Sequence, residues 1–530
     1  MALIYGFSSV FFVRTLKAAM AFVVASILIF ASAHMSFRWQ LGTNLLKVCP
    51  SYISQDDFSP TAIRCRILSA QNKARSGRRL QSSSPEEAVA EYKRRYHRTP
   101  PRGFDQWVKF AMERESQIID DFDQIDRDLE PYRDHGIRRT FQNLKGKHWD
   151  CPATTRITTQ NGTMYTSAEY RYDREWRRLV EPFINELPDS IFYLSTIDEP
   201  RILSRSGPQP SLVEFQEKVG ESIEDLIVES CDQITSKLTG PFDYYKDVCR
   251  VSNPASLHAL IASPAAFSYT HSLVPVLSFG RMSAFRDILI PCPCYVAHPL
   301  VEEDSMPFLE KQPTIYWRGS STGGRATRFA WKNGHRQRFV RFVRSLQGAA
   351  DVLDASRFLG LQVNTMNNKQ TSLLKNLFDV HMGAYVQCDD DACKDMERTL
   401  GPPDYEPADT ASNYRYLFDL DGNSMSTRFY RLLSRNAVVL KQTWFQEWHD
   451  DRLIPWADYI PVSMSMEELP ALLNYLVNDP HGEVLSAEIA LSGSTRSRKV
   501  LREIDMSIYL YRLLLEMAEM YESSNFEDSA

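Results

Sequence analysis

The signatures of several common protein classes are missing from this chain of 530 residues. Its glycines follow neither the Walker spacing nor the dinucleotide-binding fingerprint, which disfavours ATP hydrolysis and NAD binding. No two Cys-x-x-Cys motifs occur, so the sequence gives little support for a structural zinc site. The net charge of −6 shows no basic excess, and a nucleic acid is therefore not expected as a partner.

Apolar and aromatic residues, at 43% and 12%, are present in the proportions of a globular protein with a filled core. At this length two domains of roughly 150–200 residues are expected. Residues 40–85 are rich in Ser, Gln and Arg without sustained periodicity, and they are interpreted as a stem. The remaining chain is divided into an N-terminal domain at 86–300, a C-terminal domain at 301–490, and a helix and tail at 491–530.

The N-terminus carries an apolar run at residues 18–33, preceded by Arg14 and Lys17. Extended to residue 39, it is long enough for a membrane anchor, and the basic residues predict that 1–17 stay cytoplasmic. The alternative is a cleaved signal peptide, because residues 31–33 fit the small-residue cleavage rule. Either interpretation exports the body of the chain, and Asn161 in the triplet Asn-Gly-Thr is then a candidate glycosylation site.

Nine cysteines are consistent with an exported chain, and their odd number leaves at least one without a partner in the chain. Local spacing favours two bridges, Cys388 with Cys393 and Cys231 with Cys249. Cys292 and Cys294 are separated by a single proline, which predicts that they do not bridge each other.

Strands and helices alternate from about residue 310 to 480, which predicts a parallel sheet with helices on both faces. Ser465 and Glu468 have the spacing of a capping box at the start of a helix. The other expected elements are a strand at 314–317, a loop at 318–324, a helix at 327–346, a strand at 416–419, a turn at 421–423, a helix at 426–433 and a strand at 437–441.

The loop from Arg318 to Gly324 has the composition of a phosphate cradle. Glycines allow backbone N–H groups to approach an anion, a helix N-terminus adds a positive dipole, and Arg318 offers a planar pair of donors. The alternative is a loop that only connects a strand to a helix and binds no phosphate. The arginines that follow, including Arg336 and Arg338, are interpreted as a solvated helix face.

A second polar turn follows the predicted strand at 416–419, and Arg428 lies one turn into the next helix. Two such elements in one domain suit a nucleotide, one for the pyrophosphate and one for the ribose or base. Asp419 and Asp421 also form an Asp-x-Asp pattern of the kind that holds Mn²⁺ in some transferases. A metal at these residues is kept as the less favoured interpretation.

Together these segments resemble glycosyltransferase family 90, which contains the fungal capsule-associated xylosyltransferases and the animal protein O-glucosyltransferases. Residues 96–107, 118–129 and 198–201 are similar to the fungal branch, and the resemblance covers about 90–490. Its motifs are Trp317-Arg318-Gly319-Ser320, Thr322-Gly323, Asp421-Gly422, Arg428, Lys441 and Tyr459-Ile460-Pro461-Val462.

The resemblance implies an α/β protein of GT-B-like architecture, with two Rossmann-like domains facing across a cleft and UDP-sugar bound mainly by the second. It implies inversion at the anomeric carbon without a bound metal or other cofactor. Asp198 occupies the position of the proposed general base, which takes the proton of the acceptor hydroxyl. The implied donor-binding residues are Arg318, Gly319, Ser320, Thr322, Gly323, Asp421, Gly422, Ser426, Arg428 and Lys441.

The predicted protein is therefore a single-pass type II protein of the Golgi or endoplasmic reticulum membrane. Its lumenal domain transfers xylose or glucose from a UDP-sugar to a hydroxyl of a glycan or protein. One alternative is a catalytically inactive member that serves as a binding or chaperone protein, against which Asp198, Arg318 and Arg428 argue. The other is a metal-dependent transferase that uses Asp419 and Asp421.

Overall fold

The computed structural model describes residues 49–50, 53–77, 81–133, 152–203, 213–233, 243–297, 304–348 and 376–526. The predicted cytoplasmic tail and the anchor at 18–39 lie outside these residues. Within the described ranges, no helix combines the length and the apolar character needed to cross a membrane. Helix α2 (Pro60–Gly77) occupies part of the predicted stem. Contacts define two units, residues 1–69 and 70–530, and both five-stranded sheets belong to the second.

Between α2 and the first sheet, the described residues form three short helices, and their starts follow from local sequence. Ser84 caps the first of them by accepting the N–H of Glu87 at 3.2 Å, and Pro85 is its first residue. Gly103, which has a φ of +84°, precedes the second. These helices are α3 (Pro85–Tyr96), α4 (Phe104–Glu113) and α5 (Asp123–Leu129).

The first sheet has the order β2-β1-β3-β6-β7 and is mixed. Strand β1 is antiparallel to β2 and β3, whereas β3, β6 and β7 are parallel. Only this parallel part has the pairing expected of a Rossmann-like domain. The strands are β1 (Thr154–Gln160), β2 (Thr163–Thr166), β3 (Ser190–Ser195), β6 (Val276–Ser278) and β7 (Ile288–Leu289).

Short elements fill the connections of this first sheet. Helix α7 (Asp173–Val180) connects β2 to β3. The others are β4 (Gln216–Glu217), α8 (Glu224–Gln233), α9 (Asp243–Lys246), α10 (Ala259–Ala262) and β5 (Ser268–Tyr269). Strands β4 and β5 pair with each other as a separate two-stranded sheet.

The second sheet has the order β12-β11-β10-β8-β9, and every neighbouring pair is parallel. This confirms the parallel sheet predicted from the alternation of strands and helices. Its strands are β8 (Gln312–Ser320), β9 (Phe378–Ala384), β10 (Tyr414–Leu420), β11 (Val438–Gln442) and β12 (Ile460–Val462). The associated helices are α11 (His335–Gly348), α14 (Asp390–Leu400), α15 (Phe429–Ser434) and α16 (Leu469–Asn478).

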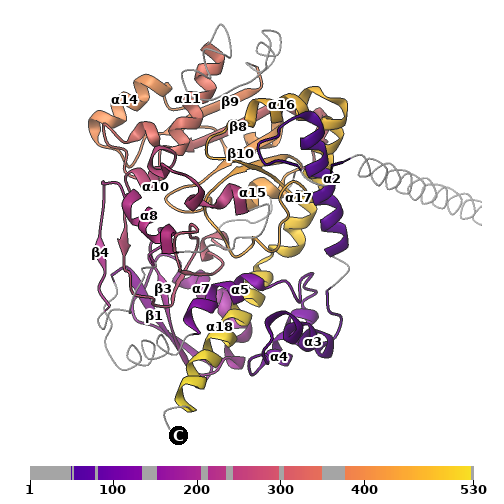
Figure 1. The fold of residues 1–530 in the computed structure, drawn as a ribbon, viewed down its shortest axis with the longest axis vertical. Helices are drawn as coiled ribbons and strands as arrows, with labels where there is room; N and C mark the ends of the chain where they lie inside the picture. The colour runs from indigo at the N-terminus through magenta and orange to yellow at the C-terminus, as the bar shows by residue number, and fades with distance from the viewer. Residues whose placement is uncertain are drawn as a thin grey trace, which may run out of the picture. The chain divides into compact units, whose positions relative to one another are not determined.

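The winding direction of the second sheet reverses between β8 and β10. From β8 the chain passes through α11 to β9 on one side, and from β10 it passes through α15 to β11 on the other. Right-handed crossovers in opposite directions place their helices on opposite faces. Figure 1 shows α11 and α14 on one side of the sheet and α16 on the other. Ligands of such sheets bind outside the carboxyl ends of the strands at the reversal.

Several helices of the second sheet start later than the sequence predicted. Helix α11 begins at residue 335 instead of 327, because the chain before it forms a turn and a separate 3₁₀ helix (Trp331–Asn333), after which Gly334 has an extended backbone with a ψ of 132°. Helix α15 is reduced to six residues. Helix α16 begins at 469, because Glu468 accepts from Ser463 instead of forming the predicted capping box.

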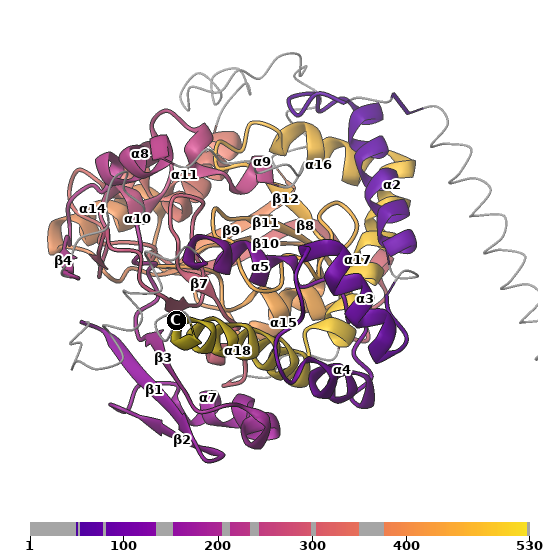
Figure 2. The ribbon, with the colours of Figure 1, turned by 60° about the horizontal axis from the view of Figure 1, so that its bottom comes forward.

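The C-terminal helices join the two sheets. Helix α17 (Pro480–Val500) contacts β11 and α15, and α18 (Glu503–Phe526) contacts α4 and α7, as Figure 2 shows. Trp107 donates its indole N–H to Ile508 O at 2.9 Å, and Phe183 stacks on Tyr511 with centroids 4.8 Å apart. One hydrophobic core contains residues of both sheets and of α18.

Four disulfides are formed among the described cysteines. The predicted pairs Cys231–Cys249 and Cys388–Cys393 are confirmed, and Cys49 pairs with Cys65. The expectation for Cys292 and Cys294 is wrong, since they are bonded to each other. Pro293 starts a 3₁₀ turn in which Cys292 is the N-cap, and this turn brings the two sulfurs together. The ninth cysteine, Cys151, lies outside the described residues.

Candidate functional site

The predicted donor-binding segments meet at the carboxyl ends of β8 and β10, where the sheet reverses. The N–H of Gly323 donates to Asn423 Oδ1 at 3.1 Å. Gly323 has a φ of +124°, and a Cβ there would lie 2.6 Å from His335 Cε1 and 3.3 Å from Gly422 O. Only glycine fits this close approach. Gly319 is the penultimate residue of β8, just before this loop.

Arg336, in the first turn of α11, fastens the two segments to each other. Its Nε donates to Asp421 O at 2.7 Å, and its Nη1 donates to Ser320 O at 3.0 Å and to Thr322 Oγ1 at 2.7 Å. His335 also donates to Asp421 O, through Nε2 at 2.8 Å. Arg336 is only 7% exposed, so its interpretation as part of a solvated helix face is wrong.

Ser426 and Lys441, two of the predicted donor-binding residues, contact Asp419 and are buried with it. Ser426 Oγ donates to Asp419 Oδ1 at 2.5 Å, and Lys441 Nζ donates to Asp419 Oδ2 at 3.1 Å. Lys441 also lies 3.5 Å from Glu447, which accepts the hydroxyl of Tyr295 at 2.7 Å. Burial opposes the charge of Lys441, but the two carboxylates raise its pKa above the ordinary value.

The second carboxylate of the Asp-x-Asp pattern is also engaged by protein groups. Asp421 Oδ2 accepts the N–H of Trp444 at 3.1 Å and lies 3.4 Å from His258 Nε2. The rings of His258 and His335 stack 4.0 Å apart. Burial raises the pKa of Asp421 and lowers that of His258 to about 3. Asp421 Oδ1 has no hydrogen-bond partner among the described residues, whereas both oxygens of Asp419 are engaged, so a cation at the pair would have to displace Ser426 or Lys441.

The two predicted phosphate-binding arginines have different environments. Arg428 donates from Nη1 to the carbonyl of Arg318, and its buried Nη2 has no hydrogen-bond partner among the described residues. The Nη2 of Arg318 contacts three carboxylates, those of Asp379 at 2.7 Å, Asp404 at 2.9 Å and Glu406 at 3.1 Å. Each arginine thus has one buried donor without a hydrogen-bond partner among the described residues, Nη2 in Arg428 and Nε in Arg318, but the charge of Arg318 is already balanced by three carboxylates.

Asp198, the predicted general base, lies in the bend that follows β3. The residue is exposed, yet desolvation by the surrounding protein raises the pKa of its carboxyl, and Arg171 partly opposes this. Strand β3 ends near this bend, so Asp198 also follows a parallel strand at its carboxyl end. None of the described contacts joins Asp198 to the donor-binding segments.

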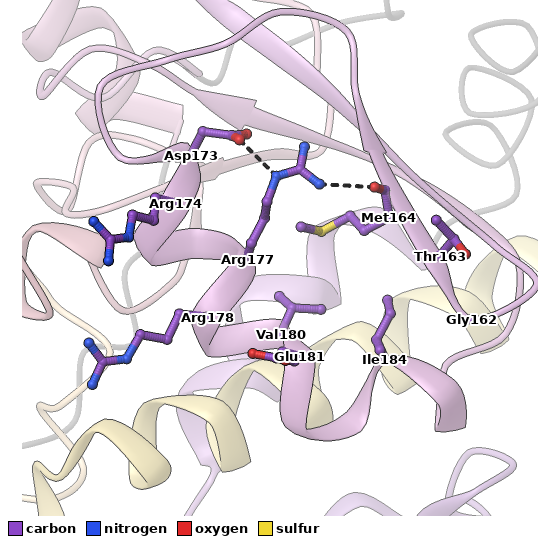
Figure 3. Close-up of a pocket in the computed structure, with 10 residues that line it drawn as sticks. All are labelled: Gly162, Thr163, Met164, Asp173, Arg174, Arg177, Arg178, Val180, Glu181 and Ile184. Carbon is purple, nitrogen blue, oxygen red and sulfur yellow. Dashed lines mark hydrogen bonds and ion pairs between the residues drawn. The ribbon is translucent and has the colours of Figure 1, made fainter.

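A surface pocket of about 640 Å³ lies apart from these residues, between the β1–β2 hairpin and α7 (Figure 3). Arg177 crosses it, with Nε donating to Asp173 at 2.7 Å and Nη1 to Met164 O at 3.1 Å. None of the predicted donor-binding residues is among those that line it. The lining residues are Gly162, Thr163, Met164, Asp173, Arg174, Arg177, Arg178, Val180, Glu181 and Ile184.

The predicted glycosylation site is at the tip of the β1–β2 hairpin, beside this pocket. Asn161 and Gly162 have φ values of 50° and 68° and connect Gln160 to Thr163 as a two-residue turn. Asn161 is exposed, as an acceptor side chain must be. Glycosylation at Asn161 stays a prediction.

Sequence reasoning missed His258, His335 and Glu447. His335 lies inside the helix predicted at 327–346, where nothing in the sequence separates it from the other polar residues of that helix. His258 and Glu447 have no local signal, because they become neighbours of Asp421 and Lys441 only through the tertiary fold.

Known proteins match this chain in its C-terminal part and over about half of its length. The model of glycosyl transferase family 90 matches residues 374–526, which include β10, α15 and β11. Human protein O-glucosyltransferase 1 is 24% identical over 273 residues, which cover 48% of this chain and 60% of the relative. The rat and bovine proteins of the same name are 31% and 30% identical over 133 residues, 24% of this chain and 33% of each relative.

These matches span less than two thirds of each relative. They confirm the resemblance to glycosyltransferase family 90 that the motifs predicted. Asp421, Gly422, Ser426, Arg428 and Lys441 fall inside the family match, whereas Asp198 and residues 318–323 lie before it.

Proposed function

We propose that this chain is an inverting glycosyltransferase that moves xylose or glucose from a UDP-sugar to a hydroxyl of a glycan or protein. The observation that carries the proposal is the joined pair of turns at the reversal of the second sheet, next to Arg428 Nη2, which has no hydrogen-bond partner among the described residues. The family match and the O-glucosyltransferase relatives support sugar transfer.

In this proposal the diphosphate binds outside the ends of β8 and β10. Arg428 Nη2 donates to a phosphate oxygen and stabilises the charge that develops as UDP departs. Arg336 and His335 keep the two turns in place through the carbonyl of Asp421. Lys441 and Ser426 contact the carboxylate of Asp419 and so fix the end of β10 beside the donor site. The backbone carbonyl of Arg318 accepts a hydrogen bond from Arg428 and holds its guanidinium in place.

Asp198 is proposed as the base on the acceptor side. As the acceptor oxygen forms a bond to the anomeric carbon, the bond from that carbon to the diphosphate oxygen breaks on the opposite face. Asp198 takes the hydroxyl proton during this attack. The reaction requires the bend after β3 and the turns of the second sheet to share a cleft, as in a GT-B architecture.

The proposed setting is the lumen of the Golgi or endoplasmic reticulum, with the chain held by a single N-terminal anchor. The apolar run at 18–33 and the basic residues before it support this placement. The disulfides support it as well, because such bonds persist in oxidising compartments. No nucleic-acid partner is proposed.

UDP is expected to bind the purified chain in the presence of a chelator, because cationic side chains supply the charge that a metal would supply. Calorimetric titration with UDP, with and without EDTA, measures this, and ADP serves as the control nucleotide. Binding that disappears in EDTA and returns with Mn²⁺ would show instead that Asp419 and Asp421 hold a metal.

A further inference from the structure

Two adjacent carboxyl groups in the bend after β3 have opposite environments. Asp198 is exposed to solvent, whereas Glu199 is only 2% exposed. Glu199 Oε1 is buried and has no hydrogen-bond partner among the described residues. A buried carboxylate with an unsatisfied oxygen is costly, whereas a buried neutral carboxyl is far less so.

The cation closest to Glu199 in sequence is committed elsewhere. Arg201 donates from Nε to Ser268 O at 3.2 Å and from Nη1 to Ala153 O at 3.0 Å, and its guanidinium lies 4.6 Å from the centre of the Phe215 ring. These contacts hold the guanidinium of Arg201 against Ser268, Ala153 and the ring of Phe215.

The remaining groups that face the two carboxyls come from two segments. Arg171 and Tyr172, which precede α7, interact with Asp198. The backbone of Ala266, before β5, hydrogen bonds to Glu199. Burial, and then the charge of Asp198, raises the pKa of Glu199 to about 8. Arg171 thus favours the charged form of Asp198, and no described cation favours that of Glu199.

We propose that Asp198 and Glu199 act as a pair that holds one proton at neutral pH, on the buried Glu199, and leaves the exposed Asp198 charged. Two neighbouring carboxyl groups share one proton in this way because the repulsion between two adjacent negative charges disfavours ionisation of both. Glu199 is then a positioning residue, and this role rests on the proposed function of Asp198. When Asp198 takes the acceptor proton, the pair holds two protons, and one leaves to water after transfer.

Ionisation of Glu199 would place an unpartnered charge inside the protein and beside Asp198. Because the folded-state pKa is raised, the stability that Glu199 contributes is fully present below about pH 4.5 and is lost progressively as the pH rises toward 8. The same ionisation should disturb the bend that positions Asp198, so transfer should also fall above pH 8.

Unfolding of the full chain from pH 5 to 8.5 tests the proton assignment without any assay of activity. The variant is Glu199→Gln, and the control is Glu217→Gln, an exposed glutamate on β4. The unfolding constant of the wild type and of the control should rise about tenfold per pH unit relative to Glu199→Gln between about pH 4.5 and 8. Equal pH dependence of all three proteins would overturn the proposal.

The pH profile of kcat/KM for the acceptor tests the positioning role. In the wild type and in Glu217→Gln, kcat/KM should fall about tenfold per pH unit above pH 8. In Glu199→Gln this alkaline decrease should be absent. A limb that persists in Glu199→Gln would overturn the positioning role. If the wild type transfers no sugar at all, the proposed function fails, and the unfolding experiment still decides where the proton resides.

Discussion

Replacing Asp198 with asparagine is expected to reduce sugar transfer by about 10²–10⁴-fold while UDP binds nearly as in the wild type. The amide cannot take the acceptor proton, but it has almost the same size and lies outside the segments assigned to the donor. Initial transfer rates and calorimetric UDP titrations of the same preparation separate these two effects.

Asp225→Asn is the matched control, because Asp225 is an exposed aspartate on α8, remote in sequence from all the donor-binding residues. It should transfer sugar at the wild-type rate. Transfer by Asp198→Asn at that same rate would mean that the base is another carboxylate, and the acceptor side of the site would have to be reassigned.

Arg428→Ala is expected to weaken UDP binding by about 1.5–3 kcal/mol, which is roughly 10–150-fold in Kd. The reason is the Nη2 of Arg428, which has no hydrogen-bond partner among the described residues and which the proposed function assigns to a phosphate oxygen. Arg428→Lys should restore only part of the affinity, since an ammonium lacks the planar fork that lets one nitrogen donate to the carbonyl of Arg318 and another to a phosphate oxygen.

Arg318→Ala provides the contrast within the same site. Its guanidinium is held by Asp379, Asp404 and Glu406. Its loss should therefore lower the melting temperature, whereas the affinity for UDP should fall less than in Arg428→Ala. Melting curves and UDP titrations of both variants give the comparison. A larger loss of UDP affinity in Arg318→Ala than in Arg428→Ala would show that Arg318 contacts the diphosphate, as the sequence alone predicted.

The second sheet was predictable because its elements are specified locally. Apolar strands, polar turns and helices alternate from β8 to α16, and this alternation predicts parallel pairing. The start of α11 was predicted too early, because a separate 3₁₀ helix at Trp331–Asn333 precedes it and Gly334 interrupts the helical backbone. The antiparallel β1–β2 hairpin gives the first sheet its mixed character, and short strands of this kind leave a weak pattern.

The meeting of the two polar turns was predictable, whereas the contacts of their side chains were not. Gly323 and Asp421 follow the ends of parallel strands, and such ends share one edge of the sheet. The contact of Lys441 with Asp419 could not be read from the sequence, because it depends on which strands are neighbours. A buried lysine needs such a partner. The charge of Lys441 is therefore balanced inside the protein and is not directed at the nucleotide.

The central claim, that this chain uses a UDP-sugar as its donor, is tested most directly by donor hydrolysis. The full chain is incubated in chelator with a series of UDP-sugars, and the release of UDP is measured against reactions without protein. UDP-xylose or UDP-glucose should be hydrolysed faster than without protein, and Asp421→Asn, which alters the turn after β10, should reduce that rate. Binding of UDP without cleavage of any UDP-sugar, and without transfer from it, would contradict the account and favour a binding protein that has lost catalysis.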